Sequence, residues 1–144
     1  MYTLYSEHFK AYTHANTGRH RRFIESARRA AEESVFPDYR HGALLVKGGS
    51  ILNSAYNKNS RIGWADRFRG KACGHATHHA ELGAILGVDR AKTSGADVYV
   101  VRIGRTGTLK LSRPCQMCQQ VLSHMGVKRV YYSIDEENVG CIKL

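Results

Sequence analysis

Hydrophobic and polar positions along this chain follow two periods, one typical of helices and one typical of strands. From residue 19 to residue 34, small and apolar residues recur every three or four positions, which predicts an amphipathic helix with one buried face. Two further helical patterns begin at His79 and at Pro114. Each stops at a glycine, Gly87 or Gly126, as helices often do.

The strand patterns are shorter and rich in β-branched and aromatic residues. Five strands are predicted, and they cover residues 41–47, 50–56, 96–103, 127–133 and 139–144. The first two flank Gly48-Gly49 and therefore form a hairpin. Because strands alternate with helices in the second half, we expect crossovers onto one sheet with helices on both faces. The expected fold is α/β, a three-layer α/β/α sandwich around a mixed five-stranded sheet.

The length of 144 residues is typical of a single domain with its own core, so we expect one domain over residues 1–144. Residues 1–17 are polar and rich in tyrosine, and we expect a loosely packed arm or a short helix there. The first ten residues lack the apolar core of a secretory signal, and no apolar run has the length of a membrane span. The expected location is the cytoplasm, without membrane contact.

The formal net charge of +10 is high for a chain of this size and indicates attraction to phosphate groups. It does not separate a free nucleotide from a polymer, and a generally basic surface would give the same value. Basic and aromatic residues, including Trp64, interleave over residues 58–77. Such a segment suits a loop that binds phosphate and stacks a base, although its rings could equally pack into the core.

Two short motifs carry candidate chemistry: His79-Ala80-Glu81, and Pro114 followed by Cys115-Gln116-Met117-Cys118. This combination is typical of zinc-dependent nucleobase deaminases. A catalytic zinc ion takes three nitrogen or sulfur ligands and keeps one position open, which His79, Cys115 and Cys118 would supply. Cysteines three residues apart lie on one face of a helix, and a helix N-terminus stabilises thiolates. We therefore predict a Zn²⁺ site.

Glu81 follows the histidine by two residues and is the predicted catalytic residue. Zinc lowers the pKa of bound water toward about 7, and the resulting hydroxide would attack the ring carbon that carries the amino group. A carboxylate is then needed to move protons from the water to the ring nitrogen and to the leaving ammonia.

Other arrangements of the same residue types remain open. A closed zinc knuckle could use Cys73 and His75 with the cysteines of the Cys-x-x-Cys pair, or that pair could be a redox motif. Cys73, His75 and His78 could also belong to a second metal site, with Cys141 as a further ligand. The alternative is that they are polar loop residues lining a substrate cleft.

The chain resembles the cytidine deaminase superfamily, in particular its deoxycytidylate and tRNA-adenosine deaminase-like branch. Besides the two metal motifs, the resemblance includes Ala43-Leu44-Leu45-Val46 before Gly48-Gly49, Ala55-Tyr56-Asn57, and the segment from Gly126 to Tyr132. It implies a sheet order of 2-1-3-4-5. It also implies zinc binding by the three ligands named above and proton transfer by Glu81.

The same resemblance implies that Asn57 contacts the sugar and that backbone groups beside Ala80 and near Arg113 frame the base. His41 and Trp64 complete the expected substrate contacts. The chain departs from related sequences at Gly83, where deoxycytidylate deaminases often have asparagine, and at Arg113, where the tRNA enzymes often have glutamate. The resemblance also implies a homo-oligomer.

The predicted function is therefore hydrolytic deamination of a cytosine nucleotide or nucleoside to the uracil product. A second hypothesis is a deaminase acting on cytosine or adenine in single-stranded DNA or RNA, which the positive charge favours. A third, of another class, is a non-catalytic zinc protein that binds nucleic acid. The first leads the second narrowly, because the basic residues are dispersed and do not form one strand-tracking run.

Overall fold

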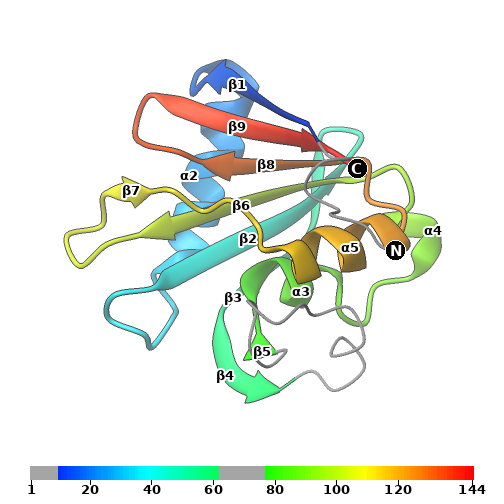
Figure 1. Ribbon diagram of the computed structural model, residues 1–144, viewed down its shortest axis with the longest axis horizontal. Helices are drawn as coiled ribbons and strands as arrows, with labels where there is room; N and C mark the ends of the chain where they lie inside the picture. Colours follow the sequence, from blue (N-terminus) through cyan, green and yellow to red (C-terminus); the bar gives the residue numbers. More distant parts are fainter. Residues whose placement is uncertain (1–9, 62–76) are drawn as a thin grey trace.

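A computed structural model describes residues 10–61 and 77–144 as one layered α/β unit (Figure 1). Its helices are α2 (Gly18–Ala31), α3 (Ala80–Ile85), α4 (Arg90–Thr93) and α5 (Gln116–His124). Its strands are β1 (Ala11–Ala15), β2 (Arg40–Lys47), β3 (Ser50–Tyr56), β4 (Lys58–Arg61), β5 (Thr77–His78), β6 (Asp97–Ile103), β7 (Leu109–Lys110), β8 (Arg129–Ser133) and β9 (Asn138–Lys143).

The main sheet has the order β1-β9-β8-β6-β2-β3, and β7 pairs with β6 outside this path. The five predicted strands correspond to β2, β3, β6, β8 and β9, so the expected order of 2-1-3-4-5 is confirmed. The sheet is mixed because β6 and β8 run parallel while its other pairs are antiparallel. It has seven strands where five were predicted, since β1 and β7 add to the expected set.

Two hydrophobic clusters lie on the two faces of this sheet. One contains residues of α3 and α5, and the other contains residues of α2. Neighbouring strand residues alternate between them: Ala43 and Leu45 pack toward α3 and α5, whereas Leu44 and Val46 pack toward α2. Figure 1 shows α2 on the far side of the sheet and α3 and α5 on the near side. The predicted three-layer sandwich is therefore confirmed.

The N-terminal segment differs from the expected arm or short helix where it is described. Ala11–Ala15 forms β1, an edge strand paired antiparallel with β9, from Ala11 opposite Ile142 to Ala15 opposite Asn138. All five of its residues are exposed, so it contributes main-chain hydrogen bonds and little core. The sequence pattern missed it because a strand exposed on both faces has no apolar alternation.

The basic and aromatic segment over residues 58–77, expected to be a loop, includes two strands among its described residues. β4 pairs antiparallel with β5, which forms a two-stranded sheet leading from β3 to the start of α3. The single turn of α4 was also not predicted, since four residues are too few to show helical periodicity. Among the described residues, no helix is long and apolar enough to cross a membrane.

Candidate functional site

The two predicted metal motifs lie at the N-termini of neighbouring helices on one face of the sheet. His79 is the extended N-cap residue of α3, and its carbonyl accepts the N–H of Gly83 at 2.9 Å. Cys115 is the extended N-cap residue of α5, with its carbonyl accepting the N–H of Gln119 at 3.0 Å. Cys118 follows one turn later and is fully buried. The sequence prediction of both helix starts is confirmed.

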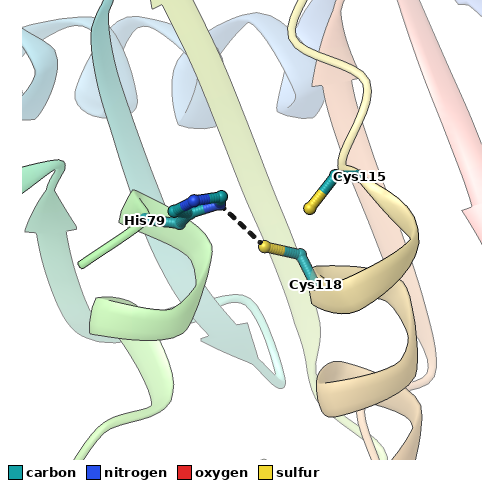
Figure 2. A group of neighbouring side chains, drawn as sticks. All are labelled: His79, Cys115 and Cys118. Atoms are coloured by element: carbon teal, nitrogen blue, oxygen red, sulfur yellow. Dashed lines mark hydrogen bonds between the residues drawn. The ribbon is translucent and has the colours of Figure 1, made fainter. Parts of the chain in front are cut away.

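Figure 2 shows the imidazole of His79 and the sulfurs of Cys115 and Cys118 pointing toward one another. Their ligand atoms all lie within 4.8 Å of one another, and His79 Nδ1 is 3.2 Å from the Sγ of Cys118. Donors around a tetrahedral zinc ion at ordinary bond lengths are about 3.5–3.8 Å apart, so these three fit one ion. They are the one group of this kind found within residues 10–61 and 77–144.

The charges of these groups suit a cation. The pKa of the Cys115 thiol is lowered to about 4. The largest cause is hydrogen bonding from Cys118, and hydrogen bonding and electrostatic attraction from His79 add to it. The hydrogen bond with Cys115 raises the pKa of His79 despite its burial, and a metal ion bound to this ring would displace the proton. A thiolate at neutral pH is the form in which cysteine binds zinc.

Glu81 lies in the first turn of α3, only 5% exposed. Burial is the largest effect on its carboxyl group and raises its pKa, while His79 opposes this shift by favouring the charged form. A carboxyl group with a raised pKa holds a proton more readily than one in water, which suits a group that must accept a proton and pass it on.

A cavity of about 430 Å³ opens beside these groups. It is lined by Phe36, Tyr39, His41, Asn57, Lys58, His79, Ala80, Glu81, Ser112, Arg113 and Cys115. Four of the expected substrate contacts thus share one cavity with the catalytic and metal-binding candidates. These four are Asn57, Ala80, Arg113 and His41. The volume is typical of a pocket for a small molecule.

Asn57 and His41 are held together at the edge of this cavity. Asn57 Oδ1 accepts the backbone N–H of His41 at 2.9 Å, and Asn57 Nδ2 donates to the Tyr39 carbonyl at 2.7 Å. His41 Nδ1 also lies 3.3 Å from that carbonyl, which can only accept, so Nδ1 carries the proton and Nε2 is an acceptor. Burial lowers the pKa of His41, so the ring is neutral at pH 7.

Sequence reasoning missed four residues that line the cavity: Phe36, Tyr39, Lys58 and Ser112. Lys58 lay inside the basic segment that was singled out, but it was not named as a contact. The other three have no local motif, because the fold brings them in from the connection before β2 and from the segment before α5. Ser112 is buried, donates to the Val100 carbonyl at 2.9 Å and accepts the Ser133 N–H at 2.9 Å.

Trp64, Cys73 and His75 lie outside the described residues, so the proposed stacking contact and second metal site stay predictions. Cys141, suggested as a further ligand for that second site, is buried in the cluster on the α2 side of the sheet. Cys115 and Cys118 are on the opposite side of the sheet.

Comparison with known proteins agrees with this arrangement. Residues 17–134 match the family described as the cytidine and deoxycytidylate deaminase zinc-binding region. The chain is 28% identical over 126 residues to a tRNA-specific adenosine deaminase of Agrobacterium fabrum (strain C58 / ATCC 33970). That match covers 83% of this chain, which spans 66% of the relative's own length.

Two solved structures are similar in fold. The dCMP deaminase of the cyanophage S-TIM5 in apo form superposes with a TM-score of 0.54 at 23% identity, covering 78% of this chain and 79% of that chain. Acinetobacter baumannii RibD, form 1, gives a TM-score of 0.51 at 18% identity, covering 79% of this chain and 27% of that chain. The family match, the converging ligand group and the shared fold lead to one conclusion: the chain belongs to the zinc-dependent cytidine and deoxycytidylate deaminase family.

Proposed function

We propose that the chain catalyses the hydrolytic deamination of a cytosine nucleotide or nucleoside to its uracil product. The observation that carries this proposal is the position of Glu81, whose buried carboxyl group shares a cavity with His79 and Cys115. Hydrolysis of a cyclic amidine needs a proton carrier beside the metal. A carboxyl group with a raised pKa is suited to that task.

His79, Cys115 and Cys118 would hold the zinc ion through one nitrogen and two sulfurs. Zinc bound in this way supplies a Lewis acid that lowers the pKa of a water molecule toward about 7. Glu81 takes one proton from the attacking water and delivers it to the ring nitrogen. It then takes the second proton, from the hydroxyl group newly bound to the ring carbon, and delivers it to the departing amino group. The carbon–nitrogen bond breaks, ammonia leaves, and oxygen takes its place on the ring carbon.

The substrate contacts proposed for this cavity divide by chemistry. Asn57 keeps one amide N–H beyond those used within the fold, and His41 offers the lone pair of Nε2, so both suit sugar hydroxyls. Arg113 and Lys58 are exposed cations on the cavity lining and suit a phosphate. The cavity volume of about 430 Å³ supports a free nucleotide or nucleoside as the first choice.

A second candidate is deamination of cytosine or adenine in single-stranded DNA or RNA. Tyr39 at the cavity is 59% exposed, and the guanidinium carbon of Arg102 lies 4.8 Å from the centroid of its ring. Exposed rings beside cations are typical of surfaces that bind single strands. The net charge of +10 and the similarity to a tRNA-specific adenosine deaminase favour the same candidate.

One assay separates these candidates. The zinc-loaded protein is incubated with dCMP, cytidine, adenosine and a cytosine-containing oligonucleotide, and ammonia release and base identity are followed. We expect turnover of dCMP or cytidine and none of the oligonucleotide. Turnover of the oligonucleotide alone supports the second candidate. Zinc binding without release from any substrate supports the non-catalytic, nucleic-acid-binding alternative.

The role of Glu81 is tested by Glu81→Gln, which keeps the shape of the side chain and removes its proton transfer. We expect unchanged zinc content and turnover reduced by about 10²–10⁴-fold. Glu136→Gln is the matched control, because Glu136 pairs with Arg28 outside the cavity. An active Glu81→Gln enzyme would show that another group moves the proton.

We also propose that the protein forms a homo-oligomer. Ile51 and Leu52 of β3 and Leu86 after α3 are 46%, 39% and 40% exposed, and Leu52 and Leu86 line a common surface depression. Contiguous exposed apolar side chains are typical of protein interfaces. Light scattering coupled to size exclusion should give at least a dimeric mass that falls to the monomer in Leu52→Asp. A monomeric wild type would refute this proposal.

A further inference from the structure

A second concave site lies at the end of β2 remote from the zinc-ligand group. It is a cavity of about 290 Å³, here called the basic cavity, on the α2 side of the sheet. Its lining residues are Arg19, Phe23, Val46, Lys47, Gly48, Gly49, Gly95, Asp97, Tyr99 and Arg129. None of them lines the cavity beside Glu81.

Three cationic side chains from three different elements meet around this cavity. Arg19 comes from the first turn of α2, Lys47 from the last residue of β2 and Arg129 from the first residue of β8. Holding like charges around one cavity costs free energy, which a bound anion would offset. The convergence of cations therefore points to a negatively charged ligand.

The partners of these cations within the described chain leave donors free for such a ligand. The side chain of Arg19 has no hydrogen bond or ion pair with residues 10–61 and 77–144. Lys47 donates one N–H to the Ala91 carbonyl at 2.9 Å and keeps two. Arg129 uses Nε on Asp97 Oδ1 at 3.2 Å, which fixes its guanidinium and leaves the terminal nitrogens. Asp97 is the one carboxylate of the lining and neutralises part of the charge.

The remaining walls limit the size and character of the ligand. The Gly48-Gly49 turn has positive φ angles of 60° and 81°, and a Cβ atom at either position would meet nothing within 4 Å. That wall is therefore open backbone. Phe23 and Tyr99 are only 2% exposed, so they form a floor and offer no ring face for stacking a base. A volume of about 290 Å³ suits a small ligand recognised through its charge.

We propose that the basic cavity binds a small phosphorylated ligand at a site separate from the zinc-ligand group. Phosphate fits this site because its oxygens can accept two parallel hydrogen bonds from an arginine guanidinium group. A lysine ammonium group adds a compact positive charge. Free phosphates are favoured over a polynucleotide backbone because the three cations surround a hollow and do not form an extended line.

The two sites are joined through the sheet. β2 runs from His41, which lines the cavity beside Glu81, to Lys47 in the basic cavity, a distance of about 20 Å for six residues. β6 pairs with β2 over this length and contributes Asp97 and Tyr99 to the basic cavity. The two sites are therefore far enough apart for a small ligand to bind in one without entering the other.

Titration calorimetry with pyrophosphate, on the zinc-loaded full chain, tests the proposal. We expect saturable binding that Arg19→Ala/Lys47→Ala weakens by at least about tenfold. The matched control Arg29→Ala/Lys110→Ala removes the same charge from exposed positions that line neither cavity and should change affinity less than twofold. Arg113→Ala, which removes a cation from the cavity beside Glu81, should also leave the affinity unchanged.

Equal weakening in both double variants would mean that pyrophosphate responds to net charge alone, which overturns the proposal. Loss of binding in Arg113→Ala alone would place the ligand in the other cavity and overturn it too. If an oligonucleotide binds through Arg19 and Lys47 and pyrophosphate does not bind, the ligand of the basic cavity is a polymer. That result would overturn the proposal of a small ligand. Thermal unfolding of each variant, with and without pyrophosphate, verifies folding and should show a ligand-dependent rise that Arg19→Ala/Lys47→Ala lacks.

Discussion

The two faces of the sheet have similar buried residues but differ in the chemistry of their cysteines. Each has a buried apolar cluster, and each contains a buried cysteine, Cys118 in α5 and Cys141 on the α2 side. Near Cys118, two helix N-termini and a histidine converge, and the pKa of the neighbouring Cys115 thiol falls to about 4. Near Cys141, burial dominates and raises the pKa of that thiol.

The difference shows that burial alone does not make a cysteine reactive. A thiolate forms where hydrogen-bond donors, a cation and helix N-terminal N–H groups offset the cost of removing charge from water. On the zinc side these groups come from two motifs of five residues or fewer. On the α2 side, the three cations of the basic cavity come from α2, β2 and β8.

The sharpest test of this comparison removes each buried thiol in turn. Cys118→Ala should lose zinc, with affinity falling by well over about 100-fold, and should lose turnover with it, because a ligand matters more than its supporting partners. Cys141→Ala should keep stoichiometric zinc and lose only packing energy. Metal analysis after gel filtration measures both. Retention of zinc by Cys118→Ala, or its loss in Cys141→Ala, would break the contrast between the faces.

The packing of α2 on the sheet can be broken at one glycine of β2. A Cβ at Gly42 would collide with the main chain of Ala27 and Ala31 in α2, and backbone atoms cannot move aside singly. Gly42→Ala should therefore lower the free energy of unfolding by about 2–4 kcal/mol, measured by chemical denaturation. Gly104→Ala is the control: its Cβ would meet only the flexible Lys110 side chain, and it should cost clearly less. Equal costs would contradict the described contact.

On the zinc side, Ser112 ties the segment before α5 to the sheet. Ser112→Ala removes the acceptor of the Ser133 N–H and the donor to the Val100 carbonyl, both buried, and should cost about 1–3 kcal/mol. Because Cys115 lies three residues further on, zinc affinity should also fall, by less than the loss in Cys118→Ala. Chemical denaturation with and without zinc measures both effects. An unchanged free energy of unfolding would exclude this anchoring role.

The smallest effect is expected at an ion pair on the α2 side. Hydrogen bonding from Arg28 lowers the pKa of Glu136, which is 41% exposed. A lowered pKa stabilises the fold above the unfolded value of about 4.3, and this contribution disappears as the pH falls through the folded value. Glu136→Gln should thus cost a few tenths of a kcal/mol at pH 7 and nothing in strong acid. A pH-independent difference would contradict the ion-pair account.

Much of this fold follows from local pattern. The helix over α2, the β2–β3 hairpin and five of the strands were predicted, because each has an apolar periodicity or a turn signal of its own. The order of those five strands was implied by the family resemblance and not by any local pattern. β1 and α4 were not, since an exposed edge strand and a single helical turn have none. Pairing of β1 with β9 depends on residues more than 120 positions apart, which no local pattern records.

The sequence by itself identified the candidate metal ligands and the candidate proton carrier, in His79-Ala80-Glu81 and in the Cys-x-x-Cys pair. It could do so because groups with these tasks must have fixed chemical types at fixed helical spacing. Only the tertiary structure decided which other side chains join them. Tyr39, Lys58 and Ser112 reach the cavity because the ends of β2 and β3 and the segment before α5 meet there. The basic cavity is likewise a product of the fold, since charges separated by up to 110 residues act together only after the sheet brings them within reach.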